Sequence, residues 1–410
     1  MTSGSDGEEQ PGSVLRSKGP WLTIIAGLWV LFVAAIVIGA LCPQLPVLGV
    51  VGASFESTLS LHVFLAGCLG IVLSVFVRRK RADLWSNAVL CLSLFVAAGA
   101  LLPLVKLVRT AREFGAPISW ADHLLATTQK SALPERLSKT VRFAKIDGQD
   151  LYADIYLPSS PNQDPSAVVL MMHGGGFIHG KRSQPNGWDR WLAGRGYTVF
   201  DIDYRLAPPP TWNQAAQDAA CAMHWIAANA QTYHVDGTRI LVAGQSAGAG
   251  LALQLAFGIA DGTVTSSCGG EVPKPVAVFA LYPPDDFPMG WNFNTALGPA
   301  RARIFLRNYI GGAPEDFPAR YAAVSAVNHV RADLPPMLIA AGDHDHLVPY
   351  KGHLELMEKL NRAGVPNILL TVPYGEHGYD IAWSGLGTQI TRHVLEEFLR
   401  KYFPAMAPVH

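Results

Sequence analysis

The stretch Gly244-Gln245-Ser246-Ala247-Gly248-Ala249-Gly250 decides the fold of this chain. An apolar, β-branched run, residues 239–243, leads into it, and helix-forming residues 251–256 follow it. A Gly-x-Ser-x-Gly between a strand and a helix pushes the serine hydroxyl out of a strained turn. The glycines allow the tight turn and a close approach of the helix. A plain turn of small residues fits the same pattern, so the rest of the sequence has to decide between a catalytic serine and a structural turn.

The sequence on both sides of this stretch alternates between short strands and helices. Residues 141–147 and 151–157 form an expected hairpin around Asp147-Gly148, with alternating apolar residues. Six further strands are expected at 167–172, 197–202, 240–243, 276–281, 337–341 and 368–372, and helices at 215–229, 351–363 and 388–402. Such alternation is typical of a mostly parallel sheet with right-handed crossovers. Residues 139–410 are therefore predicted to form an α/β domain with an eight-stranded, mostly parallel sheet flanked by helices.

Reactive residues follow several of these strands. In an open parallel sheet, ligands collect at the carboxyl ends of the strands. His173-Gly174-Gly175-Gly176, Ser246, the run Asp343-His344-Asp345-His346 and His377 each come directly after a strand. A nucleophile, an acid and a histidine thus occur in the order Ser, Asp, His, which is the order of the α/β-hydrolase fold.

These residue types predict a nucleophilic mechanism. A serine hydroxyl attacks efficiently only when a base removes its proton, and His377 is the expected base. A carboxylate would orient that imidazole, with Asp343 and Asp345 as the two candidates. The N–H of Ala247 and the amides of the His-Gly-Gly-Gly loop would stabilise an oxyanion.

The motifs also carry a family resemblance. Residues 140–403 resemble the hormone-sensitive-lipase-like carboxylesterase group of the α/β-hydrolase superfamily. The matching motifs are His173-Gly174-Gly175-Gly176, Asp203-Tyr204-Arg205-Leu206-Ala207-Pro208 and Gly244-Gln245-Ser246-Ala247-Gly248. The resemblance implies Ser246 as nucleophile, Asp345 as acid, His377 as base, and Gly175, Gly176 and Ala247 as oxyanion donors. Two positions depart from the pattern: Gln245 replaces a frequent acidic residue, and Asp345-His346-Leu347 replaces the usual Asp-Pro-Leu.

The expected function is hydrolysis of carboxylic esters by a serine carboxylesterase or lipase, through an acyl-enzyme and without cofactor or metal. Gln245 leaves a methylesterase or deacylase, similar to the isoprenylcysteine methylesterases, as an alternative. A non-catalytic, ligand-binding hydrolase fold is a further alternative. Residues 284–330 are rich in aromatic residues, proline and glycine, and they are expected to form a lid-like insertion beside the site.

Two other chemistries are disfavoured by local sequence. The run Asp343-His344-Asp345-His346 resembles a metal cluster, but neighbouring side chains on a loop point in different directions. Gly175 to Lys181 imitates a phosphate-binding loop, but Arg182 stands where Ser or Thr should bind magnesium. The net charge is +0, which gives no indication of nucleic-acid binding.

The first quarter of the chain has a different composition. Residues 1–20 are expected to be a disordered tail, 21–108 an all-α membrane anchor, and 109–138 an amphipathic connector. The anchor contains three nearly uncharged apolar runs, at about 21–41, 58–77 and 84–105, each long enough to cross a bilayer. A cleaved signal peptide competes for the first run, but two more apolar runs follow it. The expected partners are an ester or lipid substrate and a lipid bilayer, bound through residues 21–105.

The distribution of basic residues predicts the orientation. Arg78, Arg79, Lys80 and Arg81 lie between the second and third runs, and the first connection, about 42–57, has no Lys or Arg. The positive-inside rule then places the catalytic domain outside the cytoplasm of a plasma, inner or endomembrane. Lys106, Arg109 and Arg112 after the third run favour the opposite orientation. An oxidising compartment would allow Cys221 and Cys268 to pair, although the sequence does not give their distance.

Overall fold

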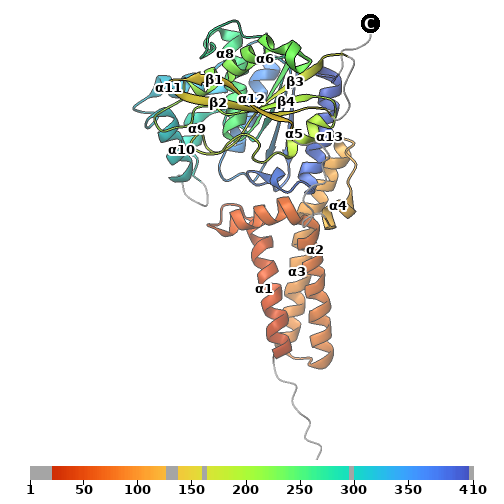
Figure 1. Ribbon diagram of the computed structural model, residues 1–410. Coiled ribbons are helices and arrows are strands. Elements are labelled where there is room, and N and C mark those ends of the chain that lie inside the picture. Colours follow the sequence, from red (N-terminus) through yellow and green to blue (C-terminus); the bar gives the residue numbers. More distant parts are fainter. Residues whose placement is uncertain (1–20, 126–136, 159–163, 295–299, 406–410) are drawn as a thin grey trace, which may run out of the picture.

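The computed structural model describes residues 21–125, 137–158, 164–294 and 300–405. The expected tail, residues 1–20, lies outside these ranges, as do 126–136 of the connector and 295–299 of the lid-like insertion. The described chain has two parts: a stalk of long helices and an α/β domain at one end of it (Figure 1).

The α/β domain is built on one eight-stranded sheet with the order β1-β2-β4-β3-β5-β6-β7-β8. The strands are β1 Lys139–Ile146, β2 Gln149–Tyr156, β3 Ser166–Met172, β4 Thr198–Ile202, β5 Val235–Gln245, β6 Ala277–Leu281, β7 Met337–Gly342 and β8 Asn367–Val372. β1 pairs with β2, and β2 with β4, in antiparallel fashion, and the other neighbours are parallel. The predicted mostly parallel sheet with an antiparallel start is confirmed.

Helices cover both faces of the sheet (Figure 1). The helices of the domain are α5 Gly187–Ala193, α6 Ala215–Ala228, α7 Ala230–Tyr233, α8 Ala247–Asp261, α9 Phe287–Asn292, α10 Ala300–Ile310, α11 Pro318–Val324, α12 Tyr350–Arg362 and α13 Leu386–Tyr402. Successive residues of a strand point to opposite faces, so a fully apolar strand serves two cores. In β3, Val168 and Leu170 pack with α6 and α8, whereas Ala167 and Val169 pack with α5 and α13.

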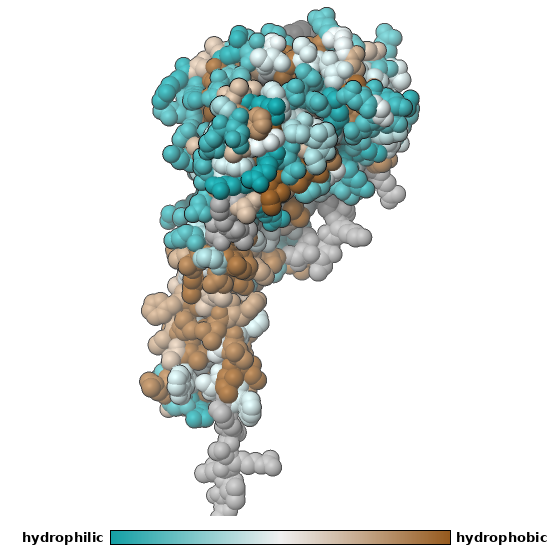
Figure 2. Space-filling model, turned by 90° about the vertical axis from the view of Figure 1, so that its left-hand side faces the viewer, coloured by the Kyte–Doolittle hydropathy of each residue, from teal (hydrophilic) through white to brown (hydrophobic). Residues whose placement is uncertain are grey.

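Three long apolar helices form the stalk: α1 Trp21–Leu41, α2 Leu48–Lys80 and α3 Leu84–Glu113. All three are long and apolar enough to cross a membrane. They pack through small residues: a Cβ added at Gly52 of α2 would lie 2.0 Å from Ala40 N of α1. Large apolar side chains, including Leu28, Phe32 and Phe95, remain more than half exposed on the outside. The stalk is therefore hydrophobic over its surface, and the α/β domain is largely hydrophilic (Figure 2).

The second helix begins earlier than the sequence indicated. It starts at Leu48, so the connection to α1 is residues 42–47 rather than about 42–57. The polar residues Ser54, Glu56 and Ser57 hid this part of the helix from a search for uncharged runs. Backbone dihedrals at Leu59 are non-helical and kink the helix there. The stretch before the kink lies across the end of the stalk nearest the α/β domain (Figure 1).

The stalk is joined to the domain by buried contacts. Leu104, Leu107 and Ala111 of α3 belong to the same apolar core as Leu386 and Ile390 of α13. The short helix α4, Trp120–Leu125, adds polar contacts through its buried His123. Ring nitrogens of His123 lie 3.4 Å from the N of Leu61 and 3.2 Å from the O of Ser384. Ala111 and Ala116 at the start of the connector thus pack on the α/β domain, whereas Trp120 and Leu125 of α4 remain exposed. We call α1–α4, residues 21–125, the helical unit.

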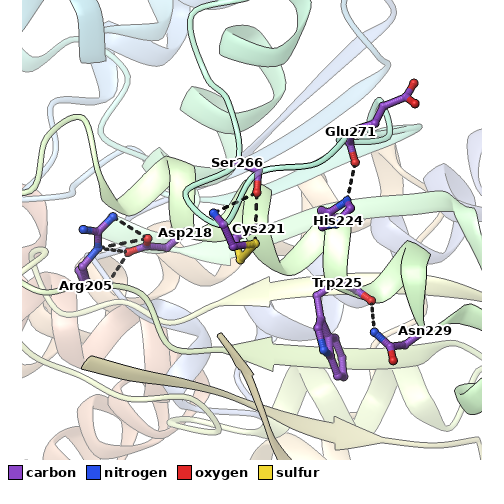
Figure 3. The surroundings of a disulfide bond; sticks show 9 residues. Arg205, Asp218, Cys221, His224, Trp225, Asn229, Ser266 and Glu271 are labelled. Carbon is purple, nitrogen blue, oxygen red and sulfur yellow. Dashed lines mark hydrogen bonds and ion pairs between the residues drawn. A yellow bond between two sulfur atoms is a disulfide. The ribbon is translucent and has the colours of Figure 1, made fainter. Parts of the chain in front are cut away.

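A disulfide joins Cys221 of α6 to Cys268 in the loop after α8 (Figure 3). The two cysteines are separated by 47 residues in the sequence. In the same region of Figure 3, Arg205 forms a forked ion pair with the buried Asp218, with Nη2 2.8 Å from Oδ1. The sequence left the pairing of these cysteines open, and the structure pairs them.

Candidate active site

Ser246 lies on the turn between β5 and α8, at the carboxyl end of the sheet. Its φ of 52° and ψ of −119° are unfavourable for a residue with a side chain. The turn is held because the N–H of Ser246 donates to Leu281 O at 2.9 Å, and its carbonyl accepts from Gly250 N. A Cβ at Gly248 would lie 2.1 Å from Met172 O, so only glycine lets α8 approach β3 this closely.

Three expected side chains meet at this edge of the sheet. His377, after β8, has Nε2 2.8 Å from Ser246 Oγ. Asp345, after β7, has Oδ2 2.7 Å from His377 Nδ1. The structure therefore brings the candidate nucleophile, base and acid into one hydrogen-bonded chain.

The structure also separates the roles of Asp343 and Asp345. Asp343 accepts from Tyr374 N and contacts His344 Nδ1 at 2.7 Å, so it braces the adjoining loops. Asp345 is buried, and its Oδ1 accepts from the N–H groups of Leu347 and Val348. These two N–H groups fix the carboxylate, which leaves Oδ2 facing His377.

The electrostatic surroundings of His377 favour a proton on the ring. Burial by itself would lower the pKa of His377, but the charge and hydrogen bond of Asp345 raise it, helped by Glu376 and Asp380. The result is a pKa above the ordinary value of 6.5. A base with this environment can take a proton from Ser246 and hold it beside Asp345.

The glycine loop after β3 borders the serine. A Cβ at Gly174 would lie 3.4 Å from Ser246 Cβ, so the two segments are in contact. Gly175 and Gly176 have φ of 125° and 62°, which favour glycine. Ala247 is the first residue of α8, and a helix gives no internal acceptor to its first N–H groups. Gly176 and Ala247 line one cavity together with Ser246, and Gly175 and Gly176 line a second cavity with it.

Tyr204 packs against His173 at the start of the glycine loop. Its hydroxyl donates to His173 O at 2.8 Å, and its ring stacks on His173 with centroids 4.4 Å apart. Burial lowers the pKa of His173, consistent with a neutral, packed ring. The guanidinium of the neighbouring Arg205 binds Asp218 and Asp147.

Gln245 contacts a carboxylate that sequence reasoning missed. Its Nε2 donates to Asp380 Oδ2 at 2.7 Å. The buried Asp380 also accepts from Tyr282 OH at 2.5 Å and from Trp188 Nε1 at 2.7 Å. Burial, followed by Asp380, raises the pKa of Tyr282 well above its ordinary value, so it remains a donor. Asp380 lies in the loop after His377, where nothing in its sequence marks it as functional.

Two adjoining cavities open at Ser246. One, of about 50 Å³, is apolar and is walled mainly by the 284–330 segment and the loop after Asp345. Its lining includes Phe177, Pro284, Phe287, Phe305, Leu306 and Val348. The other, of about 390 Å³, also contains His377, Gly175 and Gly176, and reaches Arg301 and Ile381. The site thus has a narrow apolar side and a wide, more polar side.

Metal ligands of the kind considered for residues 343–346 are not gathered at one point. Among residues 21–125, 137–158, 164–294 and 300–405, no group of three or more His, Cys, Asp or Glu could hold a metal ion. The side chains of the run face different partners: His344 contacts Asp343, and His346 contacts Glu376.

Fold and site together define an α/β-hydrolase of the carboxylesterase group. The family model BD-FAE matches residues 153–360, just over half of the chain, and the chain belongs to this family. It is similar to Esterase LipI of Mycobacterium tuberculosis, 32% identical over 238 residues, 56% of this chain and 70% of that protein.

Two further comparisons agree with this family. Esterase LipC of Mycobacterium tuberculosis is 27% identical over 254 residues, and the match covers 60% of this chain and 61% of LipC. The match thus spans only about three fifths of that relative. Among solved structures, native Est2, an esterase of Thermogutta terrifontis, is 26% identical with a TM-score of 0.53, covering 68% of this chain and 96% of Est2.

Proposed function

We propose that this protein is a membrane-anchored serine hydrolase that cleaves carboxylic esters through an acyl-enzyme. The observation that carries the proposal is the chain Ser246 Oγ, His377 Nε2, His377 Nδ1, Asp345 Oδ2, with contacts of 2.8 and 2.7 Å. Relatives that are named esterases and lipases support an ester as the substrate.

In this mechanism, Ser246 Oγ attacks the ester carbonyl carbon while His377 Nε2 takes the hydroxyl proton. The carbonyl oxygen becomes an oxyanion, which accepts hydrogen bonds from the amides of Gly175, Gly176 and Ala247. Collapse of this intermediate breaks the bond to the alcohol, which leaves with the proton from His377. Water then attacks the acyl-enzyme with His377 again as base, releasing the acid and restoring Ser246.

The two cavities support a small acyl group and a larger alcohol. The apolar cavity of about 50 Å³ has room for a short acyl chain only. The wider cavity, about 390 Å³, accepts the alcohol part and opens beside Ile381, whose side chain is 75% exposed. An alternative substrate, a methyl or acyl ester of another kind, would use the same catalytic residues.

The helical unit supports the membrane location. α1, α2 and α3 are each long and apolar enough to cross a bilayer, and they expose large apolar side chains. The basic α2–α3 connection lies at the end of the stalk away from the α/β domain (Figure 1), which favours a cytoplasmic connection and an extracytoplasmic domain. The Cys221–Cys268 disulfide is consistent with an oxidising compartment. An ester held in or near the bilayer is then the nearest substrate.

Labelling with a fluorophosphonate probe tests the chemistry. Wild type should react at Ser246 and hydrolyse p-nitrophenyl acetate, and Ser246→Ala should do neither while keeping its unfolding midpoint. A folded wild type that fails to react would favour the alternative of a non-catalytic binding protein. Protease treatment of sealed vesicles tests the orientation, since an extracytoplasmic domain is cleaved in vesicles that expose that side and protected in inverted ones.

A further inference from the structure

The loop that carries the catalytic acid touches the helical unit through one side chain. His346 Nε2 lies 2.7 Å from the carbonyl oxygen of Pro43, a residue 303 positions earlier in the chain. Pro43 lies in the connection between α1 and α2, which is only residues 42–47. The contact therefore reaches from the end of a membrane helix to the residue directly after Asp345.

The other side of the same ring leads to the catalytic base. His346 Nδ1 lies 2.6 Å from Glu376 Oε2. Glu376 Oε1 accepts from the N–H of His346 at 2.9 Å and from the N–H of His377 at 2.8 Å. One carboxylate thus ties the backbone of His377 to both the backbone and the side chain of His346.

We propose that His346 is a positioning residue through which the α1–α2 connection of the membrane anchor holds the catalytic acid and base in place. This inference rests on the proposed function of Ser246, Asp345 and His377. It makes the helical unit part of the working active site as well as a tether.

The hydrogen-bonding capacity of the ring supports this role. A neutral imidazole has one N–H, but both atoms facing the His346 ring, Glu376 Oε2 and Pro43 O, are acceptors. Both contacts are hydrogen bonds only when the ring carries two protons. Burial by itself would lower the pKa of His346, but Glu376, Pro43 and the charge of Asp345 raise it overall. The side chain is 8% exposed, so water competes little for either contact.

The ring charge also reaches His377. A protonated His346 compensates Glu376, whose charge otherwise helps to raise the pKa of His377. Removing the ring should therefore move the acid limb of the kcat/KM profile to higher pH. Loss of packing alone would lower activity without this shift.

The test compares full-length variants in detergent, with p-nitrophenyl acetate as substrate. His346→Ala should lower kcat by about 10- to 100-fold with KM within about twofold, because the triad is displaced and the cavities are untouched. His344→Ala is the matched control. It removes a histidine of the same loop that pairs with Asp343 instead of the helical unit, and should stay within about twofold of wild type.

A Gly-Gly insertion after Cys42 displaces the Pro43 carbonyl from the other side. It should lower kcat as His346→Ala does, and the combined variant should lose no more than the worse single variant. Four results overturn the proposal: wild-type kcat in His346→Ala, a loss in His346→Ala without a shift of the acid limb, an equal loss in His344→Ala, or a combined loss equal to the product of the single losses.

A variant that fails to fold, and a protein without esterase activity, can each be told apart from a failure of the coupling through His346. If His346→Ala does not fold, His346→Gln, which keeps a donor for Pro43, is combined with the insertion and judged by the same rule. If wild type lacks esterase activity, or Ser246→Ala retains it, the proposed function fails, whereas an active wild type with an unaffected His346→Ala refutes only the coupling.

Discussion

Replacing Gln245 by glutamate places a second carboxyl against a buried carboxylate. In the wild type, Gln245 Nε2 lies 2.7 Å from Asp380 Oδ2, and the two residues are only 6% and 3% exposed. Glutamate has the same shape, so in Gln245→Glu an oxygen takes the place of the donor nitrogen. Two ionised carboxylates at this distance repel strongly, and one of them has to keep its proton.

The loss of folding stability in Gln245→Glu follows from the linkage between proton binding and unfolding. In the unfolded chain the new carboxyl ionises with a pKa of about 4.3, whereas in the folded protein it stays protonated beside Asp380. The folded state then binds one more proton than the unfolded state above that pH, so relative stability falls as pH rises. At about 1.36 kcal/mol per pH unit, Gln245→Glu loses up to about 3.7 kcal/mol at pH 7 and about 1 kcal/mol at pH 5.

Urea unfolding of the purified protein at pH 5 and pH 7 measures this difference. Gln245→Met is the matched control because it removes the hydrogen bond without adding a charge, and its loss should be the same at both pH values. A Gln245→Glu loss that does not grow between pH 5 and pH 7 would refute the repulsion between the two carboxyl groups at this contact. So would equal losses for the two variants at pH 7.

Three more predictions concern the acyl side, the base and the disulfide. Phe305→Ala should raise kcat/KM for p-nitrophenyl octanoate relative to p-nitrophenyl acetate about 10-fold or more, because the Phe305 ring forms a wall of the small cavity. An unchanged ratio would contradict the assignment of this cavity to the acyl group. The acid limb of the pH profile of kcat/KM should have its midpoint above pH 6.5, because His377 must be neutral to act as a base and Asp345 raises its pKa. Asp345→Asn should lower both this midpoint and kcat. A wild-type midpoint below pH 6.5 would refute the prediction. Replacing Cys221 and Cys268 together by serine should lower the free energy of unfolding, measured in urea, by about 2–4 kcal/mol, since the disulfide spans 47 residues. The kcat per fluorophosphonate-reactive molecule should be unchanged. An unaltered unfolding midpoint would show that the disulfide is absent or adds no stability.

Much of the α/β domain was predictable because its signals are local. Apolar runs buried on both faces, and a Gly-x-Ser-x-Gly between strand and helix, depend on near neighbours in sequence. The ends of parallel strands also fall on one edge of the sheet, so Ser246, Asp345 and His377 could be expected to meet. The choice between Asp343 and Asp345 needed the structure, because it depends on which backbone N–H groups of the loops donate to each carboxylate.

Other features were hidden because their partners are distant in sequence. Asp380 has no local mark, and its contact with Gln245 spans 135 residues. This contact gives a physical reason for Gln245, since an acidic residue there would face Asp380. His346, the other departure from the expected motif, contacts Pro43 of a segment that the family resemblance does not include. The start of α2 was misjudged because Ser54, Glu56 and Ser57 interrupt the apolar pattern of the helix.

The joint between the helical unit and the α/β domain also affects when the protein can mature. Ser119 N donates to Gln389 Oε1 across 270 residues, and His346 meets Pro43 across 303. The helical unit is synthesised well before α13, and contacts between segments so far apart form late in folding. Until α13 is made, Leu104, Leu107 and Ala111 of α3 have no partner from that helix. The nascent chain therefore carries an uncovered apolar patch on α3, and a chain that stops before α13 lacks a partner of its own helical unit.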